Sequence, residues 1–301
     1  MDTSVELVRH LLQSVVYIHT TVSRDHPSTK ILGNERLGSG VVVDPSGLIL
    51  TVNYVVTGGQ TISVAFQKGR RAKAEIVAQD FEVGLALIKV NRQGLIAADV
   101  GTGDVVERCD EVVLLGAMQQ QERRATGGLV TYVGEFEAYW EYLLDRAIIT
   151  NAPNPGYGGG GLFTTSGRLA GTVSLNLNEI ARSSLAIPTD FYRNHRDELM
   201  RFGRVVSRAR RAWLGVFAQV VEEGVVVAGV VPDGPGDRGG LQEGDVIVSL
   251  NAEEVGSRRE LYTSLWRHEP GEPLTFEVMR DNKMRRFEVK GGDRAHFYRQ
   301  L

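Results

Sequence analysis

A glycine-rich stretch near the middle of the chain could do chemistry with its backbone alone. Four consecutive glycines, Gly158–Gly161, follow Asn154-Pro155-Gly156-Tyr157. Such a run forces a tight turn with few side chains, and its N–H groups stay free to point inward. A turn of this kind can hold a carbonyl oxygen or an anion. The sequence therefore offers a site built from main-chain donors.

Three segments resemble the catalytic motifs of the HtrA/Deg family of trypsin-fold proteases. The turn Asn154–Leu162 is similar to the family's Asn-Pro-Gly-Asn-Ser-Gly-Gly-Pro-Leu. The segment Leu48–Val56 resembles the strand end that carries Thr-Asn-x-His-Val-Val. The segment Val83–Val90 resembles Asp-Leu-Ala-Val-Leu-Lys. The resemblance implies where a serine, a histidine and an aspartate would lie in this chain.

Aligned without gaps, all three positions of the catalytic triad carry other residues. Gly158 stands at the serine, Tyr54 at the histidine and Gly84 at the aspartate. Of the triad machinery, only the backbone oxyanion hole could remain, through the N–H groups of Gly156 and Gly158. That remnant supplies about 10³–10⁴ over water, against total accelerations of about 10⁶–10¹⁷. The resemblance therefore implies no catalytic residues and a degenerate protease.

Two tyrosines are expected near the vacated cleft if the trypsin fold holds. Phenols can act as acid or base, so Tyr54 and Tyr157 could form a replacement constellation. An unperturbed phenol has a pKa of about 10, however, and is a poor base at neutral pH. In the alternative interpretation the two rings fill the cleft and exclude substrate.

Short β-rich runs separated by turn residues fill the first two thirds of the chain. Gly38–Thr51 reads as a hairpin around Asp-Pro and Ser-Gly, and Thr61–Phe66 and Ala72–Ala78 form a second. Without a helical period between them, such strands favour all-β barrels. We therefore expect a mainly β protein in which residues 1–198 form a trypsin-like double β-barrel.

Residues 199–211 form a basic stretch after the expected barrels, with five arginines between 201 and 211. Such a run could be a docking patch. Charge runs of this kind are usually solvated, so a linker is the other interpretation.

Residues 212–292 resemble a PDZ domain of the HtrA type, followed by a tail, residues 293–301. The matching segments are Trp213–Val216, Val230–Pro235 and Gly240–Asn251, the last with the signature Leu-x-x-Gly-Asp-x-Ile. PDZ domains add an extended peptide to a sheet edge and capture its terminal carboxylate with backbone N–H groups.

By resemblance, the carboxylate-binding loop consists of Trp213, Leu214, Gly215 and Val216. The facing wall of the peptide groove would come from a helix at Ser257–His268. Its Leu261 and Leu265 could line the groove, or could be an ordinary buried pair at helical spacing.

Composition limits the partners. The 301 residues carry a formal net charge of -3, which gives no electrostatic reason to expect nucleic acid or an anionic membrane. Cys109 is the single cysteine, and no Cys/His cluster has metal-ligand spacing, so neither a metal nor a cofactor is expected. Without a signal-like apolar run at residues 1–13, the expected location is the cytoplasm, or outside it if a leader has been removed.

Two classes of function remain open. The first is a non-enzymatic pseudoprotease that binds peptide or protein C-termini as adaptor, scaffold, chaperone or regulatory subunit in protein quality control. It would form a homotrimer, or a mixed oligomer with an active HtrA-type protease, as the family resemblance implies. The alternative is a weakly active or partner-completed hydrolase.

Overall fold

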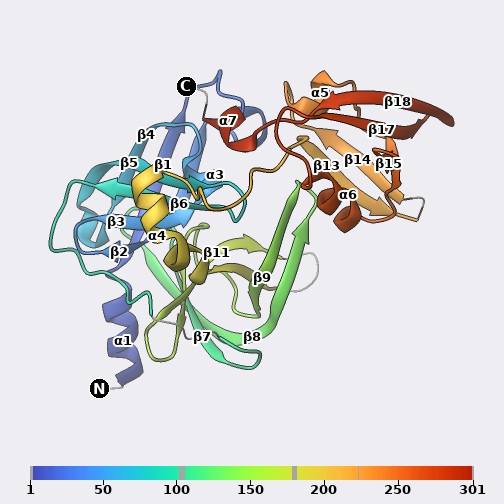
Figure 1. Cartoon of the computed structure of the whole chain (residues 1–301). Helices are drawn as coiled ribbons and strands as arrows, with labels where there is room; N and C mark the ends of the chain where they lie inside the picture. Colours follow the sequence, from blue (N-terminus) through green and yellow to red (C-terminus); the bar gives the residue numbers. More distant parts are fainter. Residues whose placement is uncertain (1–2, 102–105, 178–181, 223, 300–301) are drawn as a thin grey trace. The chain divides into compact units, whose positions relative to one another are not determined.

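The computed structural model describes residues 3–101, 106–177, 182–222 and 224–299 (Figure 1). The chain divides into two compact units, each made of segments that are distant in sequence. The first comprises Met1–Arg24, Leu32–Phe136 and Leu144–Val206, and the second Asp25–Ile31, Glu137–Leu143 and Ser207–Leu301. Both units are built mainly from antiparallel strands, which confirms the prediction of a mainly β fold.

The first barrel follows a short N-terminal helix, α1 (Thr3–Leu11). Its strands close in the order β1-β2-β3-β6-β5-β4. Their bounds are β1 Val15–Val22, β2 Glu35–Asp44, β3 Leu48–Val52, β4 Gly59–Ala65, β5 Arg71–Asp80 and β6 Leu85–Val90. All five residues of β3 are buried, so this strand runs through the core. It leads directly into the one-turn helix α3 (Asn53–Val56), which carries Tyr54.

The second barrel belongs to the same unit and closes in the order β10-β11-β12-β9-β8-β7. Its strands are β7 Glu111–Ala117, β8 Arg123–Ala138, β9 Tyr142–Thr150, β10 Gly161–Thr164, β11 Leu169–Asn176 and β12 Ser184–Pro188. Apolar side chains from these strands, including Leu114, Val130 and Leu162, form its core. The glycine-rich turn lies just before β10, where the chain returns into the barrel.

The second unit contains a sheet with the strand order β13-β14-β15-β17-β18, and β16 pairs with β15. The strands are β13 Val216–Val221, β14 Gly224–Val230, β15 Val246–Leu250, β16 Glu253–Glu254, β17 Pro273–Arg280 and β18 Lys283–Lys290. Two helices accompany them, α5 (Pro235–Arg238) and α6 (Arg258–Leu265). Because β13 stands at one end of the strand order, its outer edge is where a further segment can add to the sheet.

Two short segments from earlier in the chain join this second unit. His26, in the loop before α2 (Thr29–Leu32), lies 3.1 Å from the Tyr298 carbonyl oxygen through Nε2. Lys30 forms an ion pair of 2.7 Å with Asp233. Residues 137–143, at the turn between β8 and β9, also belong here.

The β-rich runs of the sequence predict strands at Ala125–Val133 and Ala147–Thr150. In the structure both are longer: β8 continues to Ala138, five residues beyond the predicted end, and β9 begins at Tyr142, five residues before the predicted start. The helix α4 (Asp190–Phe202) stops where Gly203 adopts a left-handed conformation, φ 68°. The expected tail contains a helix, α7 (Arg294–Tyr298), whose first turn is capped by the Asp293 side chain. In the described part of the chain, helices are too short or too polar to cross a bilayer.

Candidate functional site

Tyr54 lies in the position that the resemblance assigns to the catalytic histidine. Helix α3 places it at the end of the buried strand β3, and its hydroxyl donates a hydrogen bond to the Ser174 carbonyl oxygen at 2.7 Å. Burial raises the pKa of the Tyr54 phenol well above its ordinary value. The phenol is therefore a neutral donor with a main-chain partner, and it is a poor base at neutral pH.

Gly158 lies directly against this tyrosine. A Cβ atom built on Gly158 would overlap the Tyr54 hydroxyl oxygen and would lie 3.1 Å from the Ser174 carbonyl oxygen. Neither position can give way easily, because the hydroxyl is held by Ser174 and the carbonyl is backbone. In this arrangement the Tyr54 ring and a side chain at position 158 exclude each other.

Gly84 occupies the position assigned to the aspartate. Its backbone has φ +83°, a conformation that favours glycine. The Gly84 N–H donates to the Asp80 carbonyl at 2.9 Å, and the Gly84 carbonyl accepts from the Asn53 N–H at 2.8 Å. Position 84 thus supports the residue next to Tyr54 through its backbone.

The expected oxyanion donors lie in a turn that packs against β7. The N–H of Gly156 donates to the Asn154 side-chain oxygen at 3.2 Å, so one of the two donors has an acceptor within the turn. The neighbouring Tyr157 N–H donates to the Ala117 carbonyl at 3.0 Å. A Cβ at Gly156 would lie 2.7 Å from the Ala117 nitrogen, which explains the need for glycine at this close approach.

The two tyrosines proposed as a replacement acid–base pair have different partners. The Tyr157 ring packs edge-on against Tyr17, with ring centroids 6.3 Å apart. The Tyr54 hydroxyl instead reaches Ser174. Over the residues that the structure describes, no three His, Cys, Asp or Glu side chains are grouped closely enough to hold a metal ion.

The loop Trp213–Val216 gathers main-chain donors around one carboxylate. The N–H groups of Leu214, Gly215 and Val216 donate to the side chain of Glu141 at 3.0, 2.5 and 2.9 Å. Gly215 has φ +77°, and this left-handed residue turns the consecutive N–H groups toward a common point. The loop therefore has the geometry of a carboxylate receptor, and the carboxylate it contacts belongs to a residue of the same unit.

Glu141 was not among the predicted site residues. It lies in the turn between β8 and β9, its side chain is buried, and its backbone has φ +53°. Burial raises the pKa of the Glu141 carboxyl, while the loop amides and the Arg294 guanidinium act in the opposite direction. Arg294 also donates to the Glu141 carbonyl oxygen at 3.2 Å.

The turn that carries Glu141 lies between β13 and α6. On one side, the Ala218 N–H of β13 donates to the Tyr139 carbonyl at 2.6 Å. On the other side, the Tyr262 hydroxyl of α6 donates to the Ala138 carbonyl at 2.7 Å and accepts from the Glu141 N–H at 2.9 Å. We call this space, bounded by the loop Trp213–Val216, β13 and Tyr262, the carboxylate groove.

The remaining predicted site residues pack against other side chains of the second unit. Leu261 and Leu265 are fully buried in the core of the second unit, so the helix residue that reaches the groove is their neighbour Tyr262. Trp213 packs against Phe297 and Tyr298 of α7, with ring centroids 4.9 and 5.6 Å apart. A sequence signal for the missed residues did exist, since Glu141 is the single acid in the aromatic run Tyr139–Tyr142.

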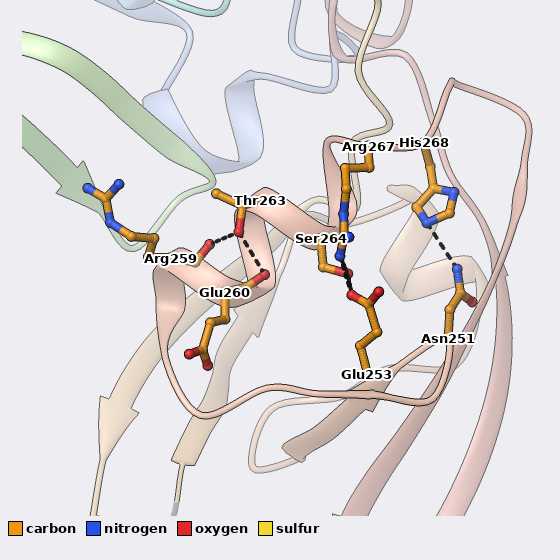
Figure 2. Close-up of polar contacts among 8 residues, drawn as sticks. All are labelled: Asn251, Glu253, Arg259, Glu260, Thr263, Ser264, Arg267 and His268. Carbon is orange, nitrogen blue, oxygen red and sulfur yellow. Dashed lines mark hydrogen bonds and ion pairs between the residues drawn. The ribbon is translucent and has the colours of Figure 1, made fainter.

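Polar contacts fix the helix α6 that carries Tyr262 (Figure 2). Glu253 binds the side chains of Ser264, at 3.1 Å, and Arg267. At the end of the helix, the Asn251 side-chain amide lies 3.1 Å from His268 Nε2. Because Asn251 and Glu253 belong to the segment after β15, these contacts attach one wall of the groove to the sheet.

Comparisons with known proteins agree with this architecture. A model of the trypsin-like peptidase domain matches residues 38–171, and a PDZ domain model matches residues 212–290. The chain is 30% identical over 279 residues to a probable periplasmic serine endoprotease DegP-like from Pseudomonas savastanoi pv. phaseolicola, covering 86% of this chain and 56% of the relative. With serine endoprotease DegS from Haemophilus influenzae, the identity is 29%, covering 89% and 82%. The chain spans about half the length of the DegP-like relatives that it matches.

Solved structures extend the similarity over nearly the whole chain. The serine endoprotease from Yersinia pestis superposes with a TM-score of 0.59 and 25% identity, covering 97% of this chain and 98% of that one. The HtrA-type protease AlgW with a tripeptide superposes with a TM-score of 0.58 and 27% identity, with the same coverage. Because this chain matches a trypsin-like peptidase domain followed by a PDZ domain and superposes on serine endoproteases of the HtrA type over nearly its whole length, it belongs to the HtrA type of trypsin-fold proteins.

Proposed function

We propose that this chain is a non-catalytic HtrA-type pseudoprotease that recognises the C-terminal carboxylates of peptides or proteins through its PDZ domain. The observation that carries the proposal is the convergence of the Leu214, Gly215 and Val216 N–H groups on one carboxylate. Hydrogen bonds to an ionised acceptor are about twice as strong as neutral ones, so such a nest favours a carboxylate ligand. The chain would act as adaptor, scaffold, chaperone or regulatory subunit.

The former catalytic region supports recognition without cleavage. A glycine at position 158 has no hydroxyl to attack a peptide bond, and the adjacent space is taken by the Tyr54 hydroxyl. The phenol is held by Ser174 and its pKa is raised, so it does not replace the histidine as a base. The relatives named serine endoproteases thus share the fold, while this chain would use it as a scaffold.

The experiment combines a binding assay with two tests for activity. Purified full chain is screened against an immobilised hexapeptide library with free C-termini, and against the same peptides with C-terminal amides. Because an amide removes the charged acceptor, we expect amidated peptides to bind at least about tenfold more weakly. Binding that ignores the terminal carboxylate would refute the assigned role of the loop.

Activity is measured on casein and with a fluorophosphonate probe for reactive serines. The proposal requires neither turnover nor labelling at any protein concentration. Cleavage that copurifies with the chain, together with a labelled serine, would establish the alternative of a weakly active hydrolase. Cleavage that begins only after a second protein is added would establish a partner-completed one.

Assembly belongs to the same proposal. HtrA resemblance favours a homotrimer or a mixed oligomer with an active HtrA-type protease. Light scattering after size-exclusion chromatography measures the mass of the assembly that the pure chain forms. A homotrimer would have three times the mass of the 33.0 kDa chain. Copurification with a catalytic relative from the native source would instead identify the mixed form.

A further inference from the structure

The turn Ala138–Glu141 is bound in the carboxylate groove as a PDZ ligand would be. Its Tyr139 carbonyl pairs with Ala218, while Glu141 contacts the amides of Leu214 to Val216. As the residue number rises in the turn it falls along the loop and β13, so the two segments run antiparallel. Addition of an antiparallel strand with a carboxylate at its end in the loop is the PDZ mode of recognition.

The backbone of the turn is strained at Glu141, the residue that makes this contact. Glu141 adopts a left-handed conformation, φ +53°, which is unfavourable for a residue with a Cβ. Its carboxylate is also buried, which is unfavourable without compensating partners. An unfavourable backbone conformation persists only where contacts with neighbouring groups hold it in place. Here those contacts are the hydrogen bonds of Glu141 with the loop amides and with Tyr262.

Aromatic contacts hold the turn against β13 and shape its tip. The Tyr139 ring lies 5.8 Å from the Phe217 ring of β13, centroid to centroid. Trp140 stacks on Tyr142 at 6.0 Å, so the tip has a fixed shape of its own. The turn therefore arrives at the groove partly preorganised, which lowers the entropic cost of docking it.

We propose that the PDZ domain carries its own ligand, with the Glu141 side chain in place of a terminal carboxylate, and that C-termini bind by displacing this turn. This inference rests on the proposed function, because it describes how the same groove is regulated. In the docked state the loop amides have no capacity for a second carboxylate. The apparent affinity for a free C-terminus equals the intrinsic affinity multiplied by the fraction of molecules in which the turn is undocked.

Hydrogen exchange tests the docked state without any ligand. In the wild-type full chain we expect the amides of Leu214, Gly215, Val216 and Ala218 to be protected. The substitution Glu141→Gln replaces one accepting oxygen with a donor, so protection at residues 214–216 should fall at least about tenfold. The matched control Glu243→Gln makes the same change at an exposed position of the same unit and should leave protection unchanged.

A second variant separates docking from folding. Glu141→Gly removes the carboxylate while relieving the left-handed strain, so the turn itself should form more easily. Loss of protection at the loop in both variants, with an unchanged thermal melting temperature, would support the proposal. Wild-type protection retained in both variants would overturn it.

Peptide binding then separates this inference from the proposed function. On the immobilised free-C-terminus hexapeptide library, Glu141→Gln and Glu141→Gly should bind at least about tenfold more tightly than wild type and Glu243→Gln. Equal affinity of all four chains would overturn self-occupancy while leaving recognition of C-termini intact. If none of the chains binds any peptide, the proposed function fails, and hydrogen exchange alone decides whether Glu141 occupies the loop.

Discussion

The hydroxyl group of Tyr54 occupies the space that a side chain at Gly158 would need. The two residues come from different barrels of the same unit and are 104 positions apart in the sequence, and the Ser174 carbonyl fixes the phenol between them. The side chains that positions 54 and 158 can carry are thus physically coupled. A serine introduced at position 158 alone would place its Cβ against an immobile oxygen.

Gly158→Ser should therefore destabilise the first unit and restore no proteolysis. Overpacking of a filled site costs about 1–3 kcal/mol, and urea unfolding followed by circular dichroism measures it. Gly127→Ser is the matched control, because a Cβ there would lie 4.0 Å from the Val112 carbonyl oxygen, at ordinary van der Waals distance. In a Tyr54→His background the cost should shrink, since the phenol is gone. Additive effects of the two substitutions would contradict the contact.

Gly84→Asp should also destabilise the fold, for a backbone reason. The left-handed conformation at φ +83° costs a residue with a Cβ about 1–2 kcal/mol. Gly84→Ala carries the same conformational cost without a charge, so the difference between the two variants isolates the carboxylate. Both are compared with wild type by urea unfolding. An unchanged midpoint for Gly84→Ala would show that the position tolerates side chains.

Asp245→Asn should strongly destabilise the second unit. Asp245 is buried and forms two bonds with the Arg280 guanidinium, Nε to Oδ1 at 2.5 Å and Nη2 to Oδ2 at 2.7 Å. Removing one charge of a buried pair costs about 3 kcal/mol or more. All three tryptophans, at 140, 213 and 266, lie in this unit, so their fluorescence reports its unfolding.

The control for this pair is Asp281→Asn, whose side chain is 81% exposed. Its ion pair with Arg285 has a distance of 3.8 Å, and exposed pairs contribute about 0–1 kcal/mol. A similar loss of stability in both variants would indicate a general effect of charge instead of the buried pair.

Much of the fold could be predicted because its signals are local. The hairpin at Gly38–Thr51 is marked by a turn dipeptide between two β-rich runs, and the structure has β2 and β3 there. The motif also predicts a carboxylate-binding loop at Trp213–Val216, and in the structure three of its amides converge on the Glu141 side chain. Binding of a terminal carboxylate by this loop stays a prediction. Both features are specified by at most fourteen consecutive residues of sequence.

The occupant of the groove could not be predicted from a local pattern. Glu141 is a single acid in a turn, and its partners lie 73 to 75 positions away. Strand β8 was predicted too short because Gly134 and the glutamates near its end disfavour a strand, and tertiary pairing overrides that preference. Similarly, Leu261 and Leu265 have helical spacing, but only the packing shows that the groove side of α6 presents Tyr262.

Docking of Glu141 should strengthen as the pH falls. Burial raises the pKa of its carboxyl above the ordinary 4.5, although the loop amides and Arg294 oppose the shift. A group whose pKa is higher when docked takes up a proton on docking. The stabilisation of the docked state by this proton uptake is complete below pH 4.5. It is lost as the pH rises through the raised pKa of the docked carboxyl.

Hydrogen exchange between pH 5 and 7, corrected for intrinsic rates, measures this dependence at Gly215 and Val216. Burial raises the pKa of the neighbouring Tyr262 phenol, so that group stays neutral over this range. In Glu141→Gln the pH dependence should vanish. Protection that grows with rising pH in the wild-type chain would contradict the assignment.

The last helix has a practical bearing on how this receptor is handled. Phe297 and Tyr298 support the indole of Trp213, the first residue of the carboxylate-binding loop. A fragment trimmed at residue 292 would keep every strand of the sheet yet lose that aromatic platform. Peptide affinities measured on so short a fragment would therefore be those of a loop whose first residue has lost its packing partners. Recombinant versions of the second unit should extend at least to Tyr298.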